Sequence, residues 1–252
     1  MPGTSDPHIS VSGVAVGYDG EVLLENIDFQ VRRGEIFAIL GGSGSGKSTL
    51  LRHLIGLAEP MRGEILVDGA PPALGSSAPI AGVLFQSGAL FGSMTLGENV
   101  GLPLTTWTDL PPEAVEAVVR SKLELVGLGG FENHLPAELS GGMKKRAGIA
   151  RALALEPPLV YLDEPSAGLD PITSAELDEL LLTLNRGLGT TLVLVTHELP
   201  SIFAIAGRCL MLDREAKGPI ALGAPADLRD HSRDPRVVAF FNRKPAVAEA
   251  ES

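Results

Sequence analysis

A glycine-rich loop between an apolar segment and an amphipathic one constrains this chain more than any other feature. Residues 36–57 read IFAILGGSGSGKSTLLRHLIGL, and residues 41–48 fit the pattern G-x-x-x-x-G-K-[S/T]. Glycines there let consecutive backbone N–H groups converge on one anion, and the positive end of the following helix points at the same place. The stretch predicts a buried strand, a phosphate-binding P-loop and a helix, which favours an α/β fold.

A nucleotide with magnesium is the ligand that such a loop fits. Lys47 is expected to hold the β- and γ-phosphates and Ser48 to bind the metal. A glycine-rich turn that binds nothing is the simpler interpretation, but the apolar run before the loop and the four leucines after it disfavour that reading. Those leucines, Leu50, Leu51, Leu54 and Leu57, are expected to face inward. The candidate nucleotide-binding residues are Gly41, Gly42, Ser43, Gly44, Ser45, Gly46, Lys47, Ser48 and Thr49.

Apolar runs predict the remaining strands. Alternating patterns early in the chain indicate half-buried antiparallel strands, at residues 8–16, 25–31 and 63–70. Denser runs indicate a mostly parallel sheet buried on both faces, at residues 35–40, 81–85, 159–162, 191–195 and 208–212. A helix over residues 172–187 is expected to pack through a leucine stripe and to stop at Gly187.

Two adjacent acids, Asp163 and Glu164, end the apolar run at 159–162. In a P-loop protein a carboxylate at such a strand end holds magnesium, usually through water, so Asp163 is a predicted metal ligand. Glu164 can then accept a proton from the attacking water, as a general base. Without the P-loop, two acids capping a strand would be a sufficient explanation.

Two further polar residues follow predicted strands. His197 follows the run at 191–195, at a strand end where ligands collect in parallel sheets, and we expect it to contact the γ-phosphate. Alone, it would more often be a core or capping histidine. Gln86 ends the run at 81–85, where its amide could contact the metal or the attacking water. By itself this is a weak signal.

A second anion site is predicted at residues 139–155. Ser140 is a good N-cap, and Ser140-Gly141-Gly142 presents a hydroxyl and exposed N–H groups at a helix start. Because residues 41–48 already form one phosphate cradle, a second site makes sense if it serves another molecule's nucleotide. The basic residues that follow have the simpler interpretation of a solvated helix face: Lys144, Lys145 and Arg146.

Composition excludes several classes of partner. The net charge of −11 over 252 residues argues against nucleic-acid binding and against direct adsorption to anionic lipid. No run of about 18 apolar residues and no signal-peptide pattern is present, so we expect no direct membrane insertion. Cys209 lies in an apolar stretch and is expected to be a buried, reduced thiol.

Five motifs in order, GGSGSGKST, FQ, LSGGM, YLDEPSAGLD and VTHE, make residues 8–230 resemble the ATP-binding subunit of an ABC transporter. The resemblance implies ATP and Mg²⁺ as ligands and a head-to-tail homodimer. In it, Ser140, Gly141 and Gly142 would face the partner's ATP, and Asp170 would line the dimer contact. Tyr18 would stack on adenine, although it could be only a strand-end aromatic. Met143 stands where the family usually has Gln, so that side-chain contact would be absent.

The same resemblance implies a P-loop NTPase of ABC ATPase type, with an N-terminal antiparallel β subdomain and a helical subdomain. We expect one ATP-binding domain, with core residues 8–87 and 157–230, helical residues 88–156 and a C-terminal extension at 231–252. The apolar residues 237–241 of that extension must cover an apolar surface, of this chain or of a partner.

Longer strings, such as LSGGMKKRAGIARALAL and THELPSIFAIAGR, are similar to the ATPases of Mla/Mce-type systems, which move phospholipids or other apolar molecules between envelope membranes. This implies integral-membrane permease subunits, a Mce-domain substrate-binding protein, and a place on the cytoplasmic face of the inner membrane. Three alternatives remain: a polar-solute importer, a non-transport ABC protein and a nucleotide kinase. The LSGGM motif has no use in a kinase.

Overall fold

The computed structural model describes residues 7–72 and 79–243, and the chain divides into two compact units, Met1–Ala73 with Val195–Ser252, and Leu74–Leu194. The last part of the expected C-terminal extension, residues 244–252, lies outside the described residues. Over the ranges that are described, none of the helices has both the length and the apolar character that crossing a bilayer requires.

The first unit begins with the antiparallel strands that the alternating patterns predict. Strand β1 (Ile9–Tyr18) pairs antiparallel with β2 (Glu21–Val31) and with β4 (Arg62–Val67), so that Ile9 lies opposite both Val31 and Val67. The inward side chains of these strands, such as Val14, are fully buried. This confirms the predicted antiparallel sheet.

The same unit carries the P-loop strand. Strand β3 (Ile36–Gly41), buried along its whole length, pairs in parallel with β8 (Arg208–Asp213), and β9 (Gly218–Gly223) adds an antiparallel strand beside β8. The sequence patterns did not predict β9, because its residues are mostly half-buried and its glycines and proline weaken the strand signal. Helix α1 (Lys47–Leu54) follows β3.

The C-terminal helices of this unit show which surface the apolar residues 237–241 cover. Helix α6 (Leu199–Ile205) precedes β8 in the chain, α7 (Pro225–His231) follows β9, and α8 (Pro235–Phe241) follows α7. Val237 and Phe241 of α8 are buried in a cluster with Leu40 and Met211. These apolar residues therefore belong to the core of this chain.

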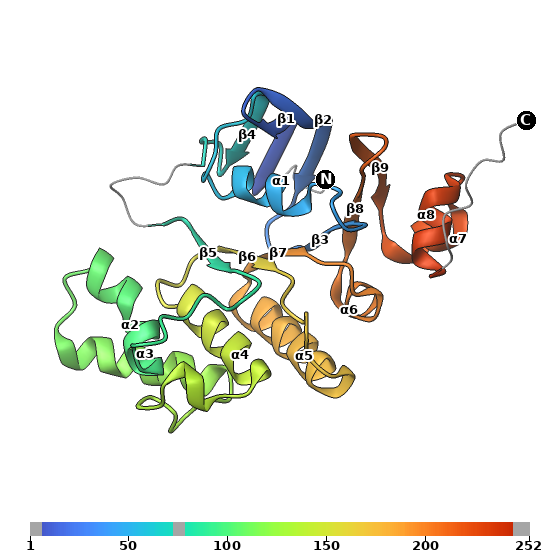
Figure 1. Ribbon diagram of the computed structural model, residues 1–252. Helices are drawn as coiled ribbons and strands as arrows, with labels where there is room; N and C mark the ends of the chain where they lie inside the picture. Colours follow the sequence, from blue (N-terminus) through green and yellow to red (C-terminus); the bar gives the residue numbers. More distant parts are fainter. Residues whose placement is uncertain (1–6, 73–78, 244–252) are drawn as a thin grey trace, which may run out of the picture. The chain divides into compact units, whose positions relative to one another are not determined.

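The second unit combines parallel strands with helices. Strand β5 (Ala81–Leu84) pairs in parallel with β6 (Leu159–Asp163), and β7 (Thr191–Val195) is the next strand in the sheet order. Helices α2 (Leu96–Trp107), α3 (Pro112–Leu125) and α4 (Gly141–Ala152) pack against one another (Figure 1). A short 3₁₀ helix, η1 (Pro136–Glu138), leads into α4, and α5 (Pro171–Leu188) follows β6.

Three predicted details are wrong. Helix α5 continues past Gly187 and ends at Leu188, where Gly189 takes the left-handed conformation (φ 69°) that closes a helix. Helix α4 ends at Ala152 and not near residue 155. Helix α1 ends at Leu54, so Leu57 lies beyond it and is 44% exposed, whereas the other three leucines of the predicted stripe are buried.

Candidate functional site

The P-loop keeps its shape because two of its glycines have no room for a side chain. Gly41 (φ 149°) and Gly46 (φ 89°) adopt positive φ values that other residues rarely accept. A Cβ at Gly41 would lie 2.4 Å from the Leu212 carbonyl oxygen, and one at Gly46 would lie 2.7 Å from Leu24 Cδ1. Gly46 also caps α1 without a side-chain hydrogen bond, which leaves the first N–H groups of the helix to an anion.

Lys47 is the cation of the P-loop, and its side chain is bonded to the backbone of the loop. Lys47 Nζ donates to the Gly41 carbonyl at 2.8 Å and to the Gly42 carbonyl at 3.0 Å. Ser48, one residue further, is exposed on the first turn of α1. An ammonium and a hydroxyl therefore accompany the N–H groups of one loop, as binding of phosphate with magnesium requires.

Tyr18 and His197 lie in the same unit as the loop. Tyr18 ends β1 with 51% of its surface exposed, and its hydroxyl is hydrogen-bonded to the hydroxyl of Thr49 in α1. His197 follows Thr196, whose N–H donates to the Ile39 carbonyl at 3.2 Å, two residues before the loop begins at Gly41. The Tyr18 side chain thus contacts the helix that follows the P-loop, and the backbone next to His197 is bonded to the strand that precedes it.

The acid pair and Gln86 come together in the second unit. Leu84 of β5 lies opposite Leu162 of β6 in a parallel register, so Gln86 and Glu164 each follow a matched strand pair by two residues. Gln86 is exposed, Asp163 is half-buried and Glu164 is 8% exposed. Glu164 also has a positive φ of 47°, a conformation that is uncommon for a residue with a side chain.

The LSGGM segment forms a capped helix start. Ser140 is the N-cap of α4, and its hydroxyl accepts a hydrogen bond from the Met143 N–H at 3.2 Å, as predicted. A Cβ at Gly142 would lie 2.7 Å from Thr173 Cγ2 at the start of α5. The glycine therefore allows α4 to approach the segment that Asp170 caps.

Asp170 is the N-cap of α5. Its carboxylate accepts from the N–H groups of Ile172 and Thr173 at 3.0 and 3.1 Å, and from the Thr173 hydroxyl at 2.5 Å. The Thr173 hydroxyl, more than any other group, lowers the pKa of Asp170. The second unit thus places Asp170 beside residues 140–142.

The simpler interpretation of a solvated helix face is wrong for Lys145. The side chain is only 6% exposed, and its ammonium donates to the backbone carbonyl of Gln86 and, at 2.9 Å, to that of Glu164. Burial lowers the pKa of Lys145, and the carboxylates of Asp163 and Glu164 offset part of that effect. Helical spacing could have given the signal, because Lys145 lies three residues after Gly142 and four before Ile149, both buried.

The predicted site residues thus fall into two sets, one in each unit. The first unit carries Tyr18, residues 41–49 and His197, and the second carries Gln86, residues 140–142, Asp163, Glu164 and Asp170.

Comparison with known sequences identifies the family. The profile of the ABC transporter family matches residues 24–167, which is more than half of the chain. The chain belongs to the ABC transporter family. This membership excludes the nucleotide-kinase alternative.

Relatives of this ABC protein are named as ATP-binding proteins of transport systems. The chain is 44% identical to the Escherichia coli (strain K12) intermembrane phospholipid transport system ATP-binding protein MlaF, over 87% of this chain and 83% of MlaF. It is 39% identical to the Mycobacterium leprae protein named "Probable ribonucleotide transport ATP-binding protein mkl", over 93% of this chain. It spans 68% of that relative's length.

A solved structure agrees with this assignment. The ABC protein matches the dimeric post-hydrolysis state of the ATP-binding cassette MJ0796 bound to ADP and Pi, with a TM-score of 0.76 and 30% identity. The match covers 86% of this chain and 98% of that one. The predicted ABC ATPase fold is confirmed, and the chain is the ATP-hydrolysing subunit of a transporter, not a non-transport ABC protein.

Proposed function

We propose that this ATPase drives a transporter that moves phospholipid, or another apolar molecule, between envelope membranes. The observation that carries the proposal is the 44% identity to MlaF over 87% of the chain. In this proposal the subunit lies on the cytoplasmic face of the inner membrane and binds integral-membrane permease subunits. A Mce-domain substrate-binding protein belongs to the same transporter.

Residues of both sets act on ATP in the proposed mechanism. Tyr18 stacks on adenine, residues 41–49 cradle the phosphates, Lys47 holds the β- and γ-phosphates, and His197 contacts the γ-phosphate. Glu164 accepts the proton of a water whose oxygen bonds to the γ-phosphorus, while the bond from that phosphorus to the ADP oxygen breaks. The buried position of the Glu164 side chain supports the role of a general base.

Ser48, Gln86 and Asp163 are the side chains that would hold Mg²⁺. All three offer oxygen, the ligand atom that magnesium prefers, and no group of three or more His, Cys, Asp or Glu among the described residues could hold a metal by itself. This fits an ion that takes most of its ligands from phosphate and water. When bound, Mg²⁺ neutralises charge that develops on the transferred phosphoryl group.

The second anion site serves the ATP of a partner subunit in this proposal. Two copies face each other, and Ser140, Gly141 and Gly142 of one contact the γ-phosphate side of the nucleotide in the other, with Asp170 at the contact. The dimeric state of MJ0796 supports this arrangement. Met143 has no side-chain amide, so the Ser140 hydroxyl and the backbone N–H groups of this segment make the contact.

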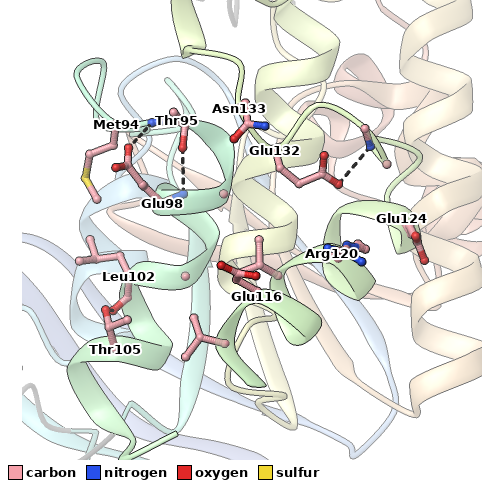
Figure 2. A pocket seen from close by; sticks show the side chains of 16 residues that line it. Met94, Thr95, Glu98, Leu102, Thr105, Glu116, Arg120, Glu124, Glu132 and Asn133 are labelled. Atoms are coloured by element: carbon pink, nitrogen blue, oxygen red, sulfur yellow. Dashed lines mark hydrogen bonds between the residues drawn. The ribbon is translucent and has the colours of Figure 1, made fainter. Parts of the chain in front are cut away.

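The helical part of the second unit offers a docking site for the permease. A cavity of about 820 Å³ lies between α2 and α3 (Figure 2), and four carboxylates line it with a single arginine, Arg120. The acidic residues are Glu98, Glu116, Glu124 and Glu132. This charge favours a permease segment that carries basic residues.

A polar cargo is the second candidate, because the name of the M. leprae relative refers to ribonucleotide transport. One experiment separates the two. The transporter containing this chain is reconstituted in proteoliposomes, and transfer of a fluorescent phospholipid to acceptor vesicles is followed with and without ATP. We expect ATP-dependent lipid transfer that Glu164→Gln abolishes. ATP-dependent uptake of a radiolabelled nucleotide without lipid transfer would contradict the lipid proposal.

A further inference from the structure

Lys145 is a buried cation in the middle of α4. Burying an ammonium is costly unless hydrogen bonds replace its hydration, and here the carbonyls of Gln86 and Glu164 accept two of them. The cation is thus bonded to backbone atoms of the two residues whose side chains are proposed to contact the metal and to activate water.

The Glu164 carbonyl is held by two donors. It accepts from Lys145 Nζ at 2.9 Å and from the Ala167 N–H at 3.2 Å. Glu164 itself has a φ of 47°, which surrounding contacts must maintain because a side chain disfavours it. Removing one donor weakens the hold on the backbone that aims the carboxylate.

The Gln86 segment is held by the same helix at a second point. Arg151, in the last turn of α4, donates to the Ala89 carbonyl at 2.7 Å and to the Gly88 carbonyl at 3.1 Å. Two cations of α4 therefore bind three carbonyls within residues 86–89. Helix α4 begins at the Ser140 cap, so one rigid element joins that cap to Gln86 and Glu164.

We propose that Lys145 is a positioning residue for ATP hydrolysis, which fixes the backbones of Gln86 and Glu164 to the helix that begins at Ser140. The inference rests on the roles proposed above for Glu164 and Gln86. Lys145 touches neither nucleotide nor water in this proposal; it acts through the direction in which the Glu164 carboxylate points. A change of about 1 Å in such a position can cost about 100-fold in rate.

Lys145→Met tests the proposal, because methionine fills similar space and donates no hydrogen bond. We expect kcat of the reconstituted transporter to fall by about 10- to 100-fold, while the affinity for ATP stays within about threefold, since the P-loop is untouched. Lys144→Met, a change to the half-buried neighbouring lysine, is the matched control and should leave kcat within about twofold. Lys145→Arg, which keeps a cation, should recover part of the loss.

Combination with Glu164→Gln separates positioning from general structural support. If Lys145 acts through Glu164, adding Lys145→Met to Glu164→Gln should lower single-turnover hydrolysis by less than about threefold further. Full multiplication of the two defects, or a fall in kcat below threefold for Lys145→Met alone, would overturn the proposal. Should the methionine variant fail to fold, Lys145→Gln is judged by the same two criteria. Wild-type turnover by Glu164→Gln would instead refute the proposed role of Glu164.

Discussion

Glu164 combines a buried side chain with a backbone conformation that few residues other than glycine adopt. A general base benefits from such a setting, because the surrounding contacts fix the direction of its carboxylate. The neighbouring Asp163 is more exposed, as a ligand of a hydrated magnesium ion should be. Two adjacent acids thus have different environments that suit different roles.

Replacing Glu164 with Gln should separate binding from turnover. The amide keeps the shape of the side chain but cannot accept the proton of water, so we expect kcat to fall by about 100- to 10,000-fold. ATP affinity, measured by isothermal titration calorimetry, should stay near the wild-type value. Turnover close to wild type would remove Glu164 from the role of base.

Cys209 should be unreactive in the folded protein. Its side chain is fully buried, and burial raises the pKa of its thiol to about 12. Because the thiolate is the reactive form, labelling by a disulfide reagent at pH 8 should be at least about 100-fold slower than in urea. The absorbance of the released thiol gives both rates, and equal rates would show that the strand β8 opens readily.

At the scale of elements, the apolar patterns predicted most strands, because alternating residues mark half-buried antiparallel strands and continuous apolar runs mark strands that are buried on both faces. The strand β9 was missed because its pattern is weak, and the end of α5 was misplaced because the chain has two glycines, Gly187 and Gly189, that could close it. Which one does so depends on backbone geometry that composition does not record.

The candidate site was also predictable only where local sequence carries the signal. Ser140 could be placed by its capping role, which the structure confirms. The binding and catalytic roles of the motif residues were inferred from spacing that suits phosphate and magnesium, and they stay predictions. Helical spacing could have indicated that Lys145 is buried but not what it binds, because its partners are backbone carbonyls 59 and 19 residues away in the sequence. Such long-range contacts arise only when the strands and α4 are assembled.

Helix α8 should stabilise the first unit measurably. Phe241 is 4% exposed within an apolar cluster, so Phe241→Ala should lower the free energy of unfolding by about 3 kcal/mol. Leu188→Ala, at a position that is 52% exposed, is the control and should change it by less than about 0.5 kcal/mol. Urea denaturation followed by circular dichroism gives both values. Equal small effects would show that α8 does not pack on the core in solution.

At the scale of the whole molecule, the chain carries two groups suited to anions, the P-loop and the capped start of α4. One ATP needs only one phosphate-binding loop. The second anion-binding group therefore points to a dimer in which each copy completes the ATP site of the other. The dimeric relative MJ0796, bound to ADP and Pi, supports that arrangement.

Mixed dimers test this claim most directly, with Lys47→Ala and Ser140→Arg placed either in different subunits or together in one subunit beside a wild-type copy. If the sites are shared, the first arrangement puts both defects into one site and leaves the other intact, whereas the second damages both. We therefore expect single-turnover hydrolysis of one ATP per dimer in the first arrangement and almost none in the second. The reverse order would show that each copy holds a complete site of its own.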